Sequence, residues 1–118
     1  MNKKLLYWVP TVLLSAMMLM SAGMYVFNYE EISLAFPKLG FPAFVIYPLA
    51  VLKVLGVIAL LTNKSKFLSE WAYAGFFFDF LLAASGHLNA GDGEAMGAFV
   101  ALALLTTSRY FWQLRTAE

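Results

Sequence analysis

The sequence contains no cysteine and only one histidine, His87. Without a thiol, the chain cannot form a disulfide, ligate an iron–sulfur cluster or exchange thiols. A single histidine cannot provide both axial ligands of a bis-histidine haem, and no Glu-x-x-His pattern accompanies it, so we expect no metal site. Glycine motifs that cradle phosphates are also missing.

Charged residues are scarce, since they make up only 13% of the chain while 62% of the residues are hydrophobic. The mean hydropathy of +0.74 lies well outside the usage of soluble proteins. This composition predicts an integral membrane protein. No basic cluster with interleaved aromatic residues is present, so we expect no nucleic-acid partner.

Four apolar segments are long enough to cross a hydrocarbon core about 30 Å thick, which takes about 20 helical residues. Helix is the state expected of each, because lipid offers no partner for an unpaired backbone group. The sequence therefore predicts an all-α fold, a single domain over residues 1–118, built as a four-transmembrane-helix bundle. The predicted helices are 5–27, 41–61, 71–88 and 95–112.

The first segment has an alternative interpretation as a cleaved signal peptide, because Lys3 and Lys4 precede it and small residues follow its apolar run. The run is longer than the usual core of about 7 to 15 residues, which favours a retained helix. The residue Pro48 is expected to bend the second helix.

Basic residues predict the orientation. With four spans, the terminal side carries six of them and the other side carries only Lys38, so the positive-inside rule places both termini in the cytoplasm. The six are Lys3, Lys4, Lys64, Lys66, Arg109 and Arg115. Aromatic residues near these ends predict an interfacial belt made of Trp8, Trp71, Tyr73, Tyr110 and Trp112.

Lys53 and Asp79 each lie near the middle of an apolar segment. A charge near the bilayer centre costs at least about 2.5 to 3.5 kcal/mol, so each needs a partner or a function. Lys53 lies eight residues before the end of its segment and Asp79 eight residues after the start of the next, so both lie about 12 Å from the same boundary. We therefore predict an intramembrane polar pair. It either fixes helix register or forms part of a site.

Small residues near this pair predict close helix packing. They are Gly56 on the second segment and Ala72, Gly75, Ala83 and Gly86 on the third. Polar residues in the opposite half of the spans from the basic ends are candidates to line a small pocket with the pair at its floor: Tyr25, Tyr47, Ser85 and His87. For Glu70 we expect a capping role at the start of the third helix, or a role as partner acid.

Several motifs resemble those of the small DoxX-like membrane proteins. They are Lys53-Val54-Leu55-Gly56 followed by a short basic loop, the run Glu70-Trp71-Ala72-Tyr73-Ala74-Gly75-Phe76-Phe77-Phe78-Asp79, Ser85-Gly86-His87, and Gly91-Asp92. The resemblance implies a four-helix bundle in a bacterial inner (plasma) membrane. The group takes its name from a subunit linked to thiosulfate:quinone oxidoreduction, and other relatives are similar to partners of redox enzymes or to assembly factors.

Three functions are compatible with these observations. The first is an accessory or binding subunit that holds a quinone-like or lipid molecule and supports a membrane redox system. The second is a non-catalytic interaction or assembly factor for another membrane protein, or a homo-oligomer. The third is a small membrane enzyme that uses Asp79 or His87 on a lipophilic substrate. Fold resemblance by itself does not choose among them.

Overall fold

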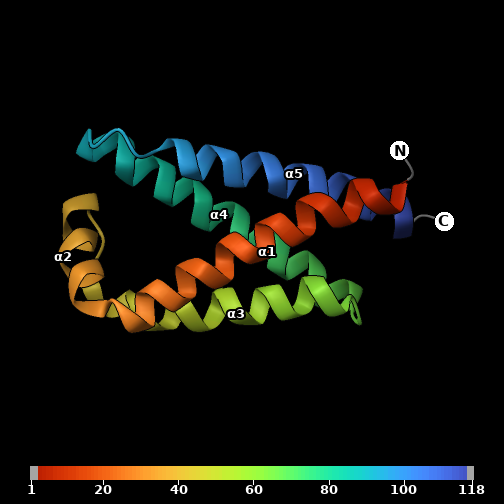
Figure 1. Cartoon of the computed structure of the whole chain (residues 1–118), viewed down its shortest axis with the longest axis horizontal. Helices are drawn as coiled ribbons and strands as arrows, with labels where there is room; N and C mark the ends of the chain where they lie inside the picture. Colours follow the sequence, from red (N-terminus) through yellow and green to blue (C-terminus); the bar gives the residue numbers. More distant parts are fainter. Residues whose placement is uncertain (1–2, 117–118) are drawn as a thin grey trace.

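The computed structural model describes residues 3–116, and over this range every regular element is a helix. Four of the α-helices are long. A short helix and a single 3-10 turn join the first long helix to the second (Figure 1). In chain order the elements are α1 (Lys3–Phe27), α2 (Tyr29–Leu39), η1 (Ala43–Val45), α3 (Ile46–Thr62), α4 (Lys66–Ala90) and α5 (Met96–Thr116).

The four long helices form a ring in which each contacts two neighbours. Helix α1 packs against α3 and α5, and α4 packs against the same two helices from the other side. The start of α1 and the end of α5 lie at one end of the bundle, which we call the terminal end, while α2 lies across the opposite end, the capped end (Figure 1). The bundle measures 46 × 25 × 19 Å. Its longest dimension exceeds the thickness of a bilayer's hydrocarbon core.

Three segments of the described chain are helical, long and apolar enough to cross a membrane. They are Lys4–Phe27, Ala43–Thr62 and Lys66–Ala90. Together with the helical fold they confirm the prediction of an all-α membrane protein. Helix α5 is not among them, since Thr106, Thr107, Ser108 and Arg109 make its second half more polar.

Helix α2 was not predicted, because the segment between residues 28 and 40 was expected to be a loop between two spans. Its sequence nevertheless suits a short amphipathic helix. Glu30 and Glu31 lie in its first turn and Lys38 in its last, so both ends complement the helix dipole. Gly40 ends the helix with a φ of 93°, a left-handed conformation that glycine adopts without strain. Phe36 is the buried residue of α2 and holds it against the bundle.

The helix boundaries correct two expectations about the second and third spans. Helix α3 begins at Ile46, so Pro48 lies in its first turn, where the missing N–H needs no partner and proline gives no reason for a bend. Helix α4 begins at Lys66, five residues earlier than expected. Ser65 caps it, because its side-chain oxygen accepts a hydrogen bond from the Leu68 N–H at 3.2 Å.

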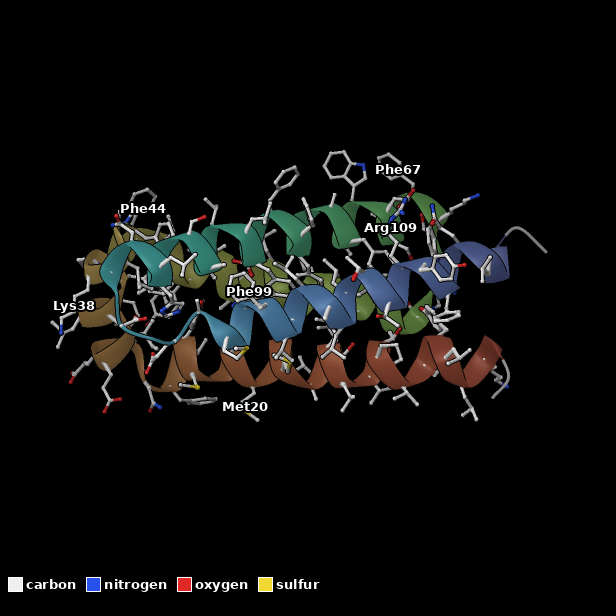
Figure 2. The ribbon with its side chains drawn as sticks, turned by 90° about the horizontal axis from the view of Figure 1, so that it is seen from above. Met20, Lys38, Phe44, Phe67, Phe99 and Arg109 are labelled. Carbon is white, nitrogen blue, oxygen red and sulfur yellow. The ribbon has the colours of Figure 1, made fainter. Side chains whose placement is uncertain are left out.

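The predicted aromatic belt is only partly correct. Trp71 and Tyr110 are exposed at 67% and 58%, and Phe67 projects from the same end of the surface (Figure 2). Tyr73 and Trp112 are instead 1% exposed, in the core. Their polar atoms have partners inside the bundle, since Trp112 Nε1 donates to Asn63 Oδ1 at 3.0 Å and Tyr73 bonds Ser108 at 2.7 Å. A Tyr or Trp side chain is expected at the membrane interface because its polar atom needs a hydrogen-bond partner. Tyr73 and Trp112 find that partner within the protein instead.

Two of the predicted small residues lie at close contacts. A Cβ atom on Gly56 would lie 2.5 Å from the ring of Phe76, and one on Gly86 would lie 3.0 Å from the ring of Phe41. Glycine is needed at both positions because another backbone or ring packs directly on it. Gly75 has nothing within 4 Å of such an atom, so the expected stripe is not continuous.

Candidate functional site

Lys53 is the centre of a polar cluster between α1, α3 and α4. Its side chain is only 7% exposed. The ammonium group donates to Ser21 Oγ at 2.6 Å and to Tyr25 OH at 3.2 Å, and lies 3.8 Å from Asp79 Oδ2. We call Ser21, Tyr25, Lys53 and Asp79 the charged cluster. It uses a side chain from each of three helices, so it ties together segments that are far apart in the sequence.

Tyr25 makes two kinds of contact with the ammonium group. The Nζ atom lies 4.3 Å from the centre of the Tyr25 ring, a distance suited to a cation–π interaction. Because a lysine ammonium group can only donate, the Tyr25 oxygen accepts from it and keeps its own hydrogen for another acceptor. The Tyr25 hydroxyl is therefore available as a donor at the edge of the cluster.

Asp79 and Tyr25 are the members of the cluster that meet open space. The Asp79 side chain is 22% exposed and lines a cavity of about 560 Å³. Aliphatic and aromatic side chains make up most of the wall, and α2 closes the cavity at the capped end of the bundle. The volume falls within the range of small-molecule sites, about 300 to 1,000 Å³. The lining residues are Tyr25, Ile32, Ala35, Phe36, Leu39, Phe41, Pro42, Val45, Leu49, Gly75, Phe78, Asp79, Leu82, Ala83, His87 and Glu94.

Of the four residues expected to line a pocket, Tyr25 and His87 line this cavity and Tyr47 and Ser85 do not. Tyr47 is half exposed and stacks on Tyr29, with ring centres 4.8 Å apart. Ser85 is exposed on α4. Positions two residues apart on a helix are about 200° apart around its axis, which is why Ser85 and His87 face different surroundings.

Sequence reasoning missed several residues of the site. Ser21 accepts the shortest hydrogen bond of Lys53, yet a serine in an apolar helix carries no distinctive signal. Phe36 and Leu39 reach the cavity from α2. Ile32, Phe36 and Leu39 recur at helical spacing, and this pattern could have indicated the helix.

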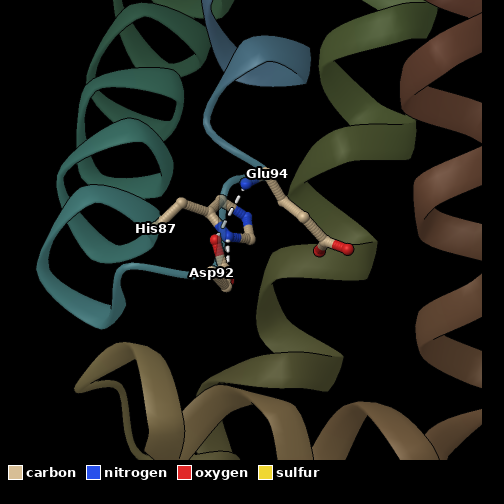
Figure 3. Close-up of side chains that lie close together, drawn as sticks. All are labelled: His87, Asp92 and Glu94. Atoms are coloured by element: carbon tan, nitrogen blue, oxygen red, sulfur yellow. Dashed lines mark hydrogen bonds and ion pairs between the residues drawn. The ribbon is translucent and has the colours of Figure 1, made fainter.

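His87 and Asp92 are hydrogen-bonded to each other where α4 ends. His87 Nδ1 lies 2.7 Å from Asp92 Oδ2, and the Glu94 N–H donates to Asp92 Oδ1 at 2.9 Å (Figure 3). The hydrogen bond to His87 and then the one from the Glu94 backbone lower the pKa of the Asp92 carboxyl below its usual value. Both oxygens of Asp92 thus have partners, and these partners stabilise the turn.

Together His87, Asp92 and Glu94 place three possible metal-ligand atoms within 4.8 Å of one another (Figure 3). The sequence predicted no metal site and did not anticipate such a group. Glu94 and Asp92 are exposed, and their grouping is also what a polar turn at a helix end produces. The contacts that Asp92 already makes account for its position.

Glu70 lies in the second turn of α4 because the helix begins at Lys66. Ser65 fills the N-cap position. Glu70 instead meets Arg109 on α5, whose Nε and Nη2 donate to its two carboxylate oxygens, each at 3.1 Å. This paired contact borders a second cavity, of about 740 Å³, between α4 and α5. Glu70 is thus placed as a partner acid, while its expected role as a cap falls to Ser65.

A second polar group crosses the bundle nearer its terminal end. Thr11 donates to the Tyr7 carbonyl at 2.6 Å and lies 2.5 Å from Ser108 Oγ, which lies 2.7 Å from the Tyr73 hydroxyl. Because Thr11 has one hydrogen and gives it to Tyr7, Ser108 donates to Thr11 and Tyr73 donates to Ser108. We call Thr11, Tyr73 and Ser108 the hydroxyl network. All three are buried.

These features can be compared with known protein families. The family model described as the DoxX-like family matches residues 9–108. The chain belongs to the DoxX-like family. The match covers most of α1, all of α2, α3 and α4 and the greater part of α5, including the charged cluster and every residue that lines its cavity. It confirms the resemblance seen in the sequence. No curated protein and no solved structure matches the chain.

Proposed function

We propose that this DoxX-like membrane protein is an accessory or binding subunit that holds a quinone-like or lipid molecule in the cavity closed by α2. The bound molecule would support a membrane redox system. The observation that carries the proposal is the cavity itself, which is apolar over most of its wall and has Asp79 and Tyr25 at one place on it. Small-molecule sites commonly combine an apolar wall with a few fixed polar groups.

The charged cluster would give this site its orientation. Asp79 accepts and the Tyr25 hydroxyl donates, so a ligand that carries both kinds of group finds a partner for each. Lys53 fixes both residues from behind through its contacts at 3.8 Å and 3.2 Å. Removing the Lys53 ammonium group should therefore both destabilise the bundle and disturb the positions of Asp79 and Tyr25, so substitution of Lys53 tests the proposal.

The proposal includes four membrane-spanning helices with both termini in the cytoplasm of a bacterium. Support comes from α5, which packs along both α1 and α4 although it is more polar than they are. Its polar side chains Thr106 and Thr107 bond to backbone carbonyls one turn earlier, as is usual for hydroxyls in lipid. The basic residues at the terminal end agree with a cytoplasmic location.

Cysteine labelling would test this topology, since the natural chain has no cysteine to interfere. Single cysteines placed at Lys64 and at Lys38 would be labelled in intact cells with a membrane-impermeant maleimide. Only the cysteine at position 38 should react before the cells are permeabilised. Labelling of position 64 in intact cells would overturn the orientation.

Native mass spectrometry of gently extracted protein would test the binding function. We expect a lipophilic molecule to co-purify in stoichiometric amount, and lipid and quinone analysis of the same sample to identify it. Phe36→Trp should displace it by filling the cavity, whereas Phe44→Trp, on the exposed side of η1, should not. Protein free of any bound molecule, with the Phe36→Trp variant indistinguishable from the natural chain, would contradict the proposal.

A second candidate function, an interaction or assembly factor, is favoured by the second cavity between α4 and α5, which is an open groove. This groove is apolar, borders the Glu70–Arg109 pair and reaches the surface beside Gly75 and Phe77. A partner helix could pack there closely, since nothing lies within 4 Å of a Cβ placed on Gly75. Ala74→Leu, at a residue that lines this groove but not the cavity closed by α2, would then abolish co-purification of a protein partner and leave the bound lipophile in place.

A further inference from the structure

The cavity wall has an uneven distribution of charge. Asp79 and Glu94 both line it, whereas none of its lining residues is lysine or arginine. The nearest buried cation, Lys53, is not part of the wall, because its ammonium group is turned toward Ser21 and Tyr25 on α1. A ligand in the cavity therefore meets carboxylates directly and the compensating ammonium group only through them.

Glu94 and His87 lie at the edge of the cavity where the turn after α4 passes (Figure 3). Asp92 bonds the ring of His87 at 2.7 Å. Glu94 uses its backbone N–H for Asp92, which leaves its carboxylate group free to turn toward a ligand. Glu94 is exposed, so its attraction for a cationic ligand is modest and weakens with added salt, while the apolar residues on the other side of the cavity add no competing charge.

Aromatic rings line the remaining wall near these acids. Tyr25 and Phe36 meet edge to face with centres 5.4 Å apart, and Phe36 and Phe41 meet at 6.1 Å. Phe78 lines the same cavity from α4. The face of an aromatic ring carries negative charge and attracts cations, and clusters of such rings bind ammonium groups in other proteins.

We propose that the cavity selects a lipophilic cation, an amine or quaternary ammonium group with a hydrocarbon tail. The inference rests on the proposed binding function: of the two ligand classes named there, it favours a lipid-like molecule with a cationic head over a neutral quinone. The ammonium head lies against the Glu94 carboxylate and the aromatic rings, Asp79 adds negative charge farther from the capped end, and the tail lies along the aliphatic residues of α2, α3 and α4. An anionic head of the same size is rejected, since it would meet the Glu94 carboxylate, which no lysine or arginine of the wall offsets.

Three ligands that share one dodecyl tail would test the selectivity: dodecyltrimethylammonium, dodecanol and dodecanoate. Each would be titrated in radiolabelled form against the full chain in phosphatidylcholine nanodiscs, with empty nanodiscs subtracted. We expect the cation to bind about tenfold tighter than the alcohol, with the carboxylate weakest. Equal affinities, or tighter binding of the alcohol or carboxylate, would overturn the inference and leave the proposed binding function standing. Absence of saturable binding by all three would overturn both.

Two variants separate the cavity acids from general surface charge. Glu94→Gln should lower the ratio of cation to alcohol affinity by about threefold or more, whereas Glu30→Gln, exposed on α2 and outside the cavity, should leave it unchanged. Phe36→Leu should lower the affinity for the cation more than the affinity for the alcohol. Each ratio compares two ligands on one protein, so partial loss of folding cancels. An equal fall in the ratio for Glu30→Gln and Glu94→Gln would contradict the inference.

Discussion

The hydroxyl network and the charged cluster cross the same bundle but differ in how they are completed. In the network, Tyr73 donates to Ser108, Ser108 to Thr11, and Thr11 to a backbone carbonyl, so every hydrogen has a buried acceptor. In the cluster, Lys53 is almost enclosed while Asp79 remains 22% exposed at a cavity. One polar group is closed within the protein, and the other has an open side.

This difference indicates different roles for polar residues within one membrane bundle. A closed, uncharged network satisfies its own members and specifies how α1, α4 and α5 pack. A charged cluster with an open carboxylate costs more to keep in lipid, and the cost is expected where a ligand uses it. Changes in the network should therefore alter stability alone, whereas changes in the cluster should alter stability and binding together.

The largest effect is expected on breaking the pair of Lys53 and Asp79. Lys53→Ala or Asp79→Ala should destabilise the bundle by about 3 to 5 kcal/mol, because each leaves a buried charge without its partner. The double change Lys53→Met/Asp79→Leu should restore most of the stability. Thermal unfolding in detergent, followed by size-exclusion chromatography, would measure these changes.

The double variant also sharpens the comparison. It should fold and yet bind no lipophile, since the polar floor of the cavity is gone. Single variants as stable as the natural chain would show that the two residues do not pair in the membrane. A folded double variant with undiminished binding would instead reduce the charged cluster to a structural role.

The next largest effect is expected at the contact between α3 and α4. In Gly56→Ala the new methyl group would lie 2.5 Å from the buried ring of Phe76. Overpacking of this kind costs about 1 to 3 kcal/mol. Gly75→Ala is the matched control, because it lies on α4 with nothing within 4 Å and should be neutral or slightly stabilising. Chemical denaturation would measure both variants. Equal stability of the two would show that the Phe76 ring does not pack against Gly56.

A smaller effect is expected in the hydroxyl network. Tyr73→Phe removes the first donor of the chain and leaves Ser108 still bonded to Thr11, so the loss should be about 0.5 to 1.5 kcal/mol. Tyr110→Phe changes the same chemical group on the exposed surface and should cost nothing measurable. Both variants should bind the lipophile as the natural chain does. Loss of binding in Tyr73→Phe would remove the distinction between the two polar groups.

The smallest effect concerns pH and the turn after α4. The folded pKa of Asp92 is lowered by its hydrogen bonds from His87 and Glu94. Its contribution to stability is therefore complete above the unfolded value of about 3.9 and is lost only as the pH falls through the lower folded value. Carboxyl carbon NMR should show Asp92 titrating below that value, and His87→Ala should raise its midpoint. An unchanged midpoint would mean that the His87 contact does not form.

Part of the candidate site could be predicted from the sequence. Lys53 and Asp79 were placed at equal depth from their positions in two adjacent apolar segments, and Nζ and Oδ2 lie 3.8 Å apart in the structure. Depth follows from counting residues along a helix, so the sequence suffices for it. Direction around the helix does not follow in the same way. Trp71 and Tyr73 illustrate this, since the first is 67% exposed and the second 1%.

The amino-acid sequence by itself determined that the chain belongs in lipid, that it is helical there, and which ionisable residues lie within apolar segments, because these depend on composition and on counting residues. The tertiary structure alone decided that α2 covers the capped end, that Ser21 and Tyr25 hold Lys53, and that His87 reaches the cavity while Ser85 does not. Those outcomes depend on the rotation of each helix about its axis. Packing against neighbours sets that rotation, and no single segment encodes it.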